Sequence, residues 1–360
     1  MDSITHLFYG ATICAAIAPA KHRRAALLAG AALNTLPDLD VFPLMLLDDP
    51  VLRMTWHRGS THSLLVLPFI ALGLWWWFRR RGGRVADAPR RWWWAILVTL
   101  LAHPLLDAFT VYGTQLWWPL MQPPAMWSSL FIIDPLFSLP WILAAVSAWF
   151  LRRDMAAQRV LVSGLLLGVG YLGWSMLAKQ RVEQALASTL EGTQLATAPR
   201  FSVPAPLNTL LWRVVVLTPD GYLEGEHSLV ADSGPIRFRE HHDERALLGD
   251  VAAFPRVARL LWFNHHFVRA EMTDDGLLLS DLRMGSEPDY VFRFLVAQND
   301  GKQWRPLVPV QRVPSTLGRS QNLGDIWHRI WQPPDDDGVG LPGQAAADRF
   351  GSMPAASASK

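Results

Sequence analysis

The chain has 360 residues, of which 51% are hydrophobic and only 18% are charged, with 18 tryptophans and a formal net charge of +2. Soluble proteins carry about 25% charged residues, so this composition argues against a single soluble globular domain. One cysteine, Cys14, excludes a disulfide within the chain, and no dense basic face indicates nucleic-acid binding. Long apolar runs lie before residue 180 and most acidic residues lie after it, which predicts a membrane half followed by a water-soluble half.

The first half is predicted to be a membrane α-helical bundle with four clear spans and up to six. Four apolar runs approach the roughly 20 residues that cross a bilayer, namely residues 63–78, 92–111, 131–151 and 160–178. Two weaker segments, residues 4–20 and 25–47, precede them. The second contains Pro37, Asp38 and Asp40, so it is expected to be kinked, re-entrant or partly inserted. The N-terminus lacks a basic region and a small-residue cleavage site, so no cleaved signal peptide is expected.

Basic residues predict the orientation of these segments. Arginine, lysine and histidine gather in the loops at residues 21–24, 79–91 and 152–159, whereas residues 112–130 carry no charge. Because cytoplasmic loops are enriched in arginine and lysine, the three basic loops are placed inside and the uncharged loop outside. The N-terminus and everything after residue 178 then lie on the outer side. Tryptophan clusters at residues 75–77 and 92–94 are typical of aromatic belts.

Nine ionisable residues lie at membrane depth or at span ends, and this topology places all of them toward the outer face. They are His6, Asp38, Asp40, His57, Arg58, His62, His103, Asp107 and Asp134. Ionisable groups are costly in a bilayer, so such a cluster predicts a functional site.

The residue types in this cluster are those of a metal centre. His103 and Asp107 are four residues apart and share one helix face, where imidazole nitrogen and carboxylate oxygen suit Zn²⁺. In "LPDLD", a turn at Pro37 would let one aspartate bind a metal and the other orient a histidine. Arg58, beside a helix start at Ser60 or Thr61, would suit an anionic oxygen such as a phosphate.

Each residue also has a purely structural interpretation. His103 could be a hydrogen-bonded core histidine, and Asp107 could pair with it or with Arg58. The two aspartates after Pro37 are common turn residues. His57 could face lipid headgroups, and Asp134 before a proline could simply begin a helix. At the level of function, a proton or ion transporter and a non-catalytic scaffold braced by a metal are the alternatives to an enzyme. Many transporters contain internal repeats, and this sequence shows none, which favours the enzyme.

Four motifs in order, "THLFYGA", "LPDLD", "HRGSTHS" and "HPLLDAFTVYGTQLWWP", resemble the YdjM-type family of bacterial inner-membrane, metal-dependent hydrolases over roughly residues 1–180. The resemblance implies a divalent metal, expected to be Zn²⁺, and metal ligands at His6, Asp38, His62, His103 and Asp107. Whether His57 or His62 is the ligand stays open. The series is also distantly similar to helical zinc-dependent phospholipase C enzymes.

The resemblance implies metal-assisted hydrolysis, and the topology predicted from the basic loops places it at the outer face of the inner membrane, with the C-terminal half in the periplasm. The expected partners are the lipid bilayer and a phospholipid or another lipid-linked phosphoester as substrate. Asp40 or Asp134 is the expected general base, and Arg58 is expected to hold the phosphate.

Residues 179–332 are predicted to form a separate β-rich or α+β domain, and residues 333–360 a disordered tail. Expected strands are residues 211–217, 222–229, 235–240, 259–272, 277–282 and 289–297, with a turn at residues 274–276. A short linking helix is expected at residues 181–190. The histidine pairs at residues 241–242 and 265–266 are interpreted as surface residues, because adjacent strand residues point to opposite faces.

Overall fold

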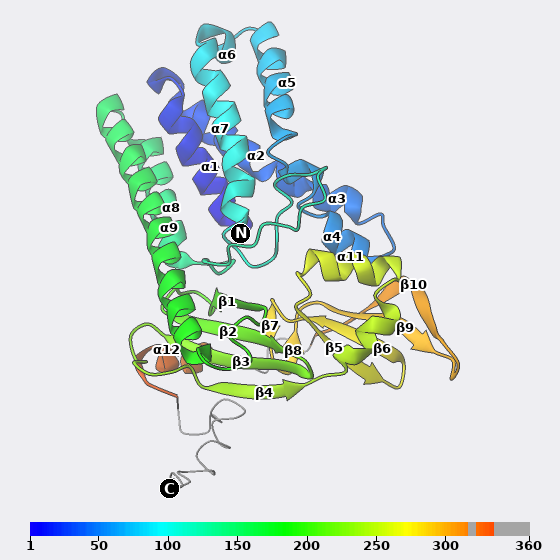
Figure 1. Cartoon of the computed structure of the whole chain (residues 1–360). Coiled ribbons are helices and arrows are strands. Elements are labelled where there is room, and N and C mark those ends of the chain that lie inside the picture. Colours follow the sequence, from blue (N-terminus) through cyan, green and yellow to red (C-terminus); the bar gives the residue numbers. More distant parts are fainter. Residues whose placement is uncertain (316–321, 335–360) are drawn as a thin grey trace, which may run out of the picture.

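The computed structural model describes residues 1–315 and 322–334, so most of the predicted tail, from residue 335 on, lies outside the described residues. A helical bundle is followed by a β-rich part (Figure 1). The N-terminus lies at the end of the bundle that faces the sheets (Figure 1). The order of the two parts agrees with the sequence prediction.

The bundle is made of six longer helices joined by short helices and turns. The longer helices are α1 (Ser3–Ile17), α2 (Arg23–Thr35), α5 (Leu67–Arg80), α7 (Pro89–Asp107), α8 (Pro135–Phe150) and α9 (Asp154–Leu190). The short elements are η1 (Ala20–His22), η2 (Pro37–Asp40), α3 (Val41–Leu44), α4 (Pro50–Trp56), η3 (Ser60–His62) and α6 (Arg84–Asp87).

By length and composition, one helix of the described residues is a clear membrane span. This is α9, whose 37 residues are apolar over much of their length. The number is up to three if each of two bent helix pairs is one span: Ala20–Thr35 with Pro37–Leu44, bent by 40°, and Pro50–His62 with Leu67–Arg80, bent by 56°. The first of these bends falls within residues 25–47, the segment expected to be kinked, re-entrant or partly inserted. α1 and α8, with 15 and 16 residues, are shorter than the roughly 20 residues of a full span.

Glycines let the first two helices touch backbone to backbone. A Cβ on Gly10 of α1 would lie 2.4 Å from the carbonyl oxygen of Gly30 on α2, and a Cβ on Gly30 would lie 2.2 Å from that of Gly10. Small residues at a crossing allow such an approach in membrane helices. His6 lies one turn before Gly10 and Asn34 one turn after Gly30, so the crossing brings these two polar side chains together.

The β-rich part contains two four-stranded antiparallel sheets, ordered β1-β2-β3-β4 and β10-β9-β6-β5. The first contains β1 (Arg200–Pro204), β2 (Leu211–Thr218), β3 (Gly221–Ser228) and β4 (Phe238–His242). The second contains β5 (Val268–Thr273), β6 (Gly276–Asp281), β9 (Arg293–Asn299) and β10 (Trp304–Val313). The remaining elements are β7 (Gly285–Ser286), β8 (Asp289–Tyr290), η4 (Arg245–Leu247), α10 (Leu248–Val251), α11 (Pro255–Phe263) and α12 (Leu323–Trp331).

One predicted strand is wrong in its first part, because the start of residues 259–272 belongs to α11. Pro255 occupies the first turn of this helix, and the buried side chains of Val257, Leu260 and Leu261 recur at helical spacing. The strand begins only at Val268.

The helix predicted at residues 181–190 is the C-terminal end of α9, which continues from the bundle without a break. Val182, Leu186 and Leu190 of this end pack against Trp212 and Val214 of the first sheet. The predicted domain boundary at residue 178 therefore falls within a continuous helix.

A second connection between the two parts is the packing of α4 on α11 (Figure 1). Val51 and Met54 of α4 share a buried core with Val257 and Leu261 of α11. Polar contacts reinforce it, since Arg256 pairs with Asp49 at 2.6 Å, and Arg259 donates to the Thr55 hydroxyl and carbonyl oxygens at 2.5 and 3.3 Å.

Candidate metal centre

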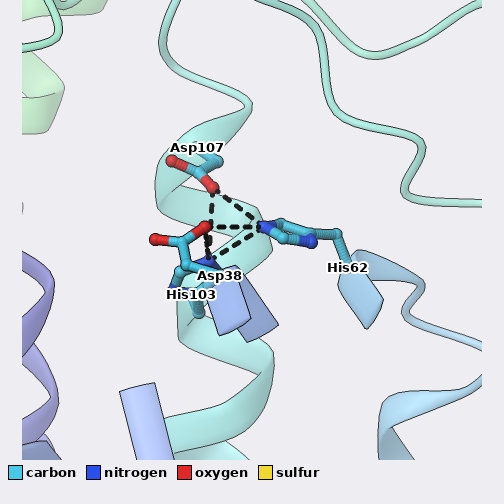
Figure 2. Close-up of side chains that lie close together, drawn as sticks. All are labelled: Asp38, His62, His103 and Asp107. Carbon is cyan, nitrogen blue, oxygen red and sulfur yellow. Dashed lines mark hydrogen bonds and ion pairs between the residues drawn. The ribbon is translucent and has the colours of Figure 1, made fainter. Parts of the chain in front are cut away.

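Four side chains from three segments converge near the C-terminal end of α7. Asp38 comes from η2, His62 from η3, and His103 and Asp107 from α7. One ligand atom from each lies within 4.8 Å of the others. Figure 2 shows the four side chains directed at one another. Three are fully buried, whereas 22% of the Asp38 side chain is exposed.

The spacing of the ligand atoms is that of a small coordination sphere. His62 Nε2 and His103 Nε2 are 3.0 Å apart. Asp38 Oδ1 lies 3.3 and 3.4 Å from these two nitrogens, and Asp107 Oδ2 lies 3.4 and 3.3 Å from them. Four ligands at about 2.0–2.2 Å from a tetrahedral Zn²⁺ would be about 3.3–3.6 Å apart. Four of these five distances fall in that range, so the donor set could hold a divalent metal such as zinc.

Hydrogen bonds behind the two histidines fix which nitrogen faces the centre. His103 Nδ1 donates to the carbonyl oxygen of Asn34 at 2.5 Å. Thr61 donates its hydroxyl hydrogen to Asp40, so His62 Nδ1 donates to Thr61 Oγ1 at 3.0 Å. Both Nε2 atoms then present lone pairs to each other and to two carboxylates, an arrangement that a cation would stabilise.

The two carboxylate oxygens of Asp107 have different surroundings. Oδ1 lies 3.1 Å from His6 Nε2, forms an ion pair with the Arg58 guanidinium at 3.1 Å and accepts from the amino group of Met1. Oδ2 is buried and has no hydrogen-bond partner among the described residues. Such an orphaned oxygen is costly unless it binds a cation, and it is the atom that faces both histidines.

His6 lies beside the four converging residues. Its ring stacks on that of His103, with 3.9 Å between the centroids, and its Nδ1 lies 3.2 Å from Asn34 Oδ1. Asn34 also donates to the Thr99 carbonyl at 2.7 Å, which fixes its amide. In this arrangement His6 holds Asp107 in place.

Asp40 accepts hydrogen bonds from the loop that carries His57 and His62. Its carboxylate accepts from His57 Nδ1 at 2.7 Å, from Thr61 Oγ1 at 2.8 Å and from the backbone N–H of Arg58 at 3.3 Å. Of the two histidines on this loop, His62 points its Nε2 into the centre. His57 stays partly exposed at its edge, 5.8 Å from His62 between ring centroids.

Arg58 is held tightly in this loop. Its backbone has a φ of +60°, a left-handed conformation that is unfavourable for arginine. Its guanidinium contacts Asp107, donates to Thr110 Oγ1 at 3.2 Å and lies 4.9 Å from the ring centroid of Tyr112. Its Nε has no hydrogen-bond partner in the described part of the chain.

Asp134 occupies a different environment. It caps α8 by accepting from the Phe137 N–H at 3.1 Å, and it accepts from the Tyr171 hydroxyl at 2.8 Å. Within residues 1–315 and 322–334, no hydrogen bond or ion pair joins it to the four converging residues.

Sequence reasoning missed three residues that shape this centre: Asn34, Thr61 and Tyr112. A signal was available for Asn34, because an amide within the apolar run "AALNTL" has to find partners in a buried helix. Thr61 was considered only as a helix cap.

Residues 1–182 match the family model described as "YdjM inner membrane protein". The chain belongs to this family. All four converging residues lie in the matched region, and the family description makes the lipid bilayer the surroundings of the YdjM region. Neither the curated proteins nor the solved structures provided a significant match.

Proposed function

We propose that this YdjM family protein is a membrane-bound, metal-dependent hydrolase that acts on a lipid-linked phosphoester at the outer face of the inner membrane. The observation that carries the proposal is the convergence of Asp38, His62, His103 and Asp107, with two imidazole lone pairs and an unpartnered carboxylate oxygen directed at one point. The proposed topology has four to six membrane segments, with the β-rich half in the periplasm.

The same four residues would hold the metal, for which Zn²⁺ fits the donor set. Zinc held by these four residues, with a fifth position open to water, would supply a nucleophile at neutral pH by lowering the pKa of that water to about 7. His6 and Asn34 would keep Asp107 and His103 in their orientations, as outer partners of a metal site commonly do.

Proton transfer is assigned to Asp40 with its partner His57. The two are hydrogen bonded at 2.7 Å, and the His57 side chain is 26% exposed, so it can meet both the substrate and water. Asp134 was the other candidate base. Its cap and its tyrosine contact support a structural role, so the proposal rests on Asp40.

Substrate binding is assigned to Arg58. Its buried guanidinium borders Asp107 and keeps one N–H without a partner, which suits a phosphate oxygen.

A lipid substrate is supported by the apolar surface next to the centre. The chain between Asp38 and α4 exposes several large apolar side chains, namely Leu39, Val41, Phe42, Met45 and Leu46. A short segment of this kind is stable where apolar residues enter the headgroup region of a membrane. A centre that borders such a segment would meet lipid headgroups.

The test combines metal content with turnover. Detergent-purified wild type, Asp38→Asn, Arg58→Gln and the control Asp48→Asn are analysed by metal mass spectrometry and for hydrolysis of bis(p-nitrophenyl) phosphate and of a phospholipid. We expect wild type and Asp48→Asn to hold zinc and to be active, Asp38→Asn to lose both properties, and Arg58→Gln to keep zinc and lose turnover. A folded wild type that binds no added divalent metal would refute the proposal and favour a transporter. Arg58→Gln with full activity would favour a scaffold role for the metal.

A further inference from the structure

A hollow lies on the flank of the helical bundle, and none of the four converging residues lines it. Its volume is about 450 Å³, within the range of small-molecule sites. It is lined by α2 and the following Leu36, by α5, by α7 and by residues 82–85 at the start of α6. The side chains of the longer helices include Ala29 and Ala32 of α2, Leu74 and Phe78 of α5, and Ile96 of α7. We call this hollow the flank groove.

Both α2 and α5 pack against α7, and the buried side chains of Trp92 and Ile96 on α7 form its floor. On α2 the alanines at 25, 29 and 32 follow helical spacing, so small side chains leave the space open. The groove walls are apolar except at the end formed by Gly83 and Arg84.

The other end of the flank groove is close along the chain to residues of the metal centre. Leu36, which lines this end, is two residues before Asp38, and Leu33 precedes Asn34, whose carbonyl binds His103. From Ala25 to Leu36 the groove follows α2 for about 16 Å, at about 1.5 Å per residue. That length is about half of a hydrocarbon core of roughly 30 Å.

We propose that the flank groove binds a hydrocarbon chain of the substrate while its phosphoester lies at the metal centre. The inference rests on the proposed function and narrows the substrate to a lipid with a long chain. At membrane depth an apolar groove excludes water, so lipid hydrocarbon is the occupant that its walls accept. The position of Arg58 agrees with this placement of the lipid, because its unpartnered N–H lies at the metal centre, where the phosphoester would bind.

The test uses two phospholipids with the same headgroup, a water-soluble dihexanoyl form and a dipalmitoyl form in mixed micelles. Ala29→Trp fills the groove, and Leu28→Trp places the same side chain on an adjacent, lipid-exposed position of α2 that does not line it. We expect Ala29→Trp to lower kcat/KM for the long-chain lipid by about tenfold or more, as when a few methylenes lose their burial, and to leave the short-chain lipid within about twofold. Leu28→Trp should match wild type on both.

Equal long-chain turnover by Ala29→Trp and wild type would overturn the groove assignment and leave the proposed function standing. If wild type hydrolyses neither lipid, binding of the hydrocarbon chain is measured separately by photocrosslinking. A phospholipid with a diazirine at the end of its acyl chain is crosslinked to wild type and both variants in nanodiscs, and the labelled peptides are sequenced. Labelling of α2 and α5 at the groove that is lost in Ala29→Trp supports chain binding, whereas labelling unchanged by Ala29→Trp refutes it.

Discussion

Metal removal should lower the thermal stability of this protein, and the effect should depend on Asp38. The four ligand atoms are already within 4.8 Å of one another, so an ion binds the folded chain without a rearrangement that would offset its affinity. The unfolded chain has no such convergence. A metal at one hundred times its Kd therefore stabilises the fold by about 2.7 kcal/mol. For a chain of 360 residues, with an unfolding entropy of about 2.1 cal/mol/K per residue, that is a rise in Tm of about 3–4 °C.

Asp38→Asn is the cleanest perturbation. Asp38 lies in a turn and is partly exposed, whereas removing Asp107 would also leave the buried Arg58 without a counter-charge. Intrinsic fluorescence of the 18 tryptophans in detergent reports unfolding after treatment with EDTA and again after zinc is restored. Wild type and Asp48→Asn should gain about 3–4 °C with zinc, and Asp38→Asn less than about 1 °C. An equal gain in Asp38→Asn, or none in wild type with any divalent metal, would refute the assignment of these ligands.

Three further outcomes follow from particular contacts. Gly168→Ala should lower Tm, because its Cβ would lie 1.7 Å from an indole ring of α8 and overpacking costs about 1–3 kcal/mol or more, whereas Gly170→Ala meets no atom within 4 Å and should not destabilise. Burial opposes the ionisation of Glu224, but the guanidinium of Arg213 outweighs it and holds the pKa of this carboxyl below its usual value. The pair therefore stabilises the fold at neutral pH and loses its effect as pH falls through that lowered pKa, so the destabilisation by Arg213→Gln in urea titrations should be largest near pH 7 and shrink toward pH 4. Arg259→Ala removes two hydrogen bonds to α4 and should weaken zinc binding, measured by competition with a chelator, without removing any ligand; unchanged affinity would show that α11 does not position the centre.

Local spacing was enough to predict the part of the centre that lies on one helix. His103 and Asp107 are separated by one turn of α7, so their convergence follows from helix geometry alone. The choice between His57 and His62 could not be predicted in this way. It depends on the turn at Ser60–His62 and on the left-handed backbone at Arg58, neither of which has a periodic signal.

The parts of the fold that depend on local sequence could also be predicted, whereas those that depend on long-range contacts could not. Strands β2 and β3 were predicted closely, because their β-branched and aromatic residues flank a Pro-Asp-Gly turn. The span count exceeded what the helices show, because apolar runs do not reveal where a helix begins or bends. The continuity of α9 into the second half also could not be read from composition, since its apolar face changes from lipid to the first sheet along one helix.

The family match ends at residue 182, yet the centre within it depends on residues beyond that point. The loop that carries Arg58 and His62 follows α4, a helix of only seven residues, which is too short to be stable without tertiary packing. That packing comes from α11 through a shared apolar core and an ion pair to Asp49. The second half therefore contributes to the candidate metal centre by position, because it packs on the helix that precedes the loop of Arg58 and His62.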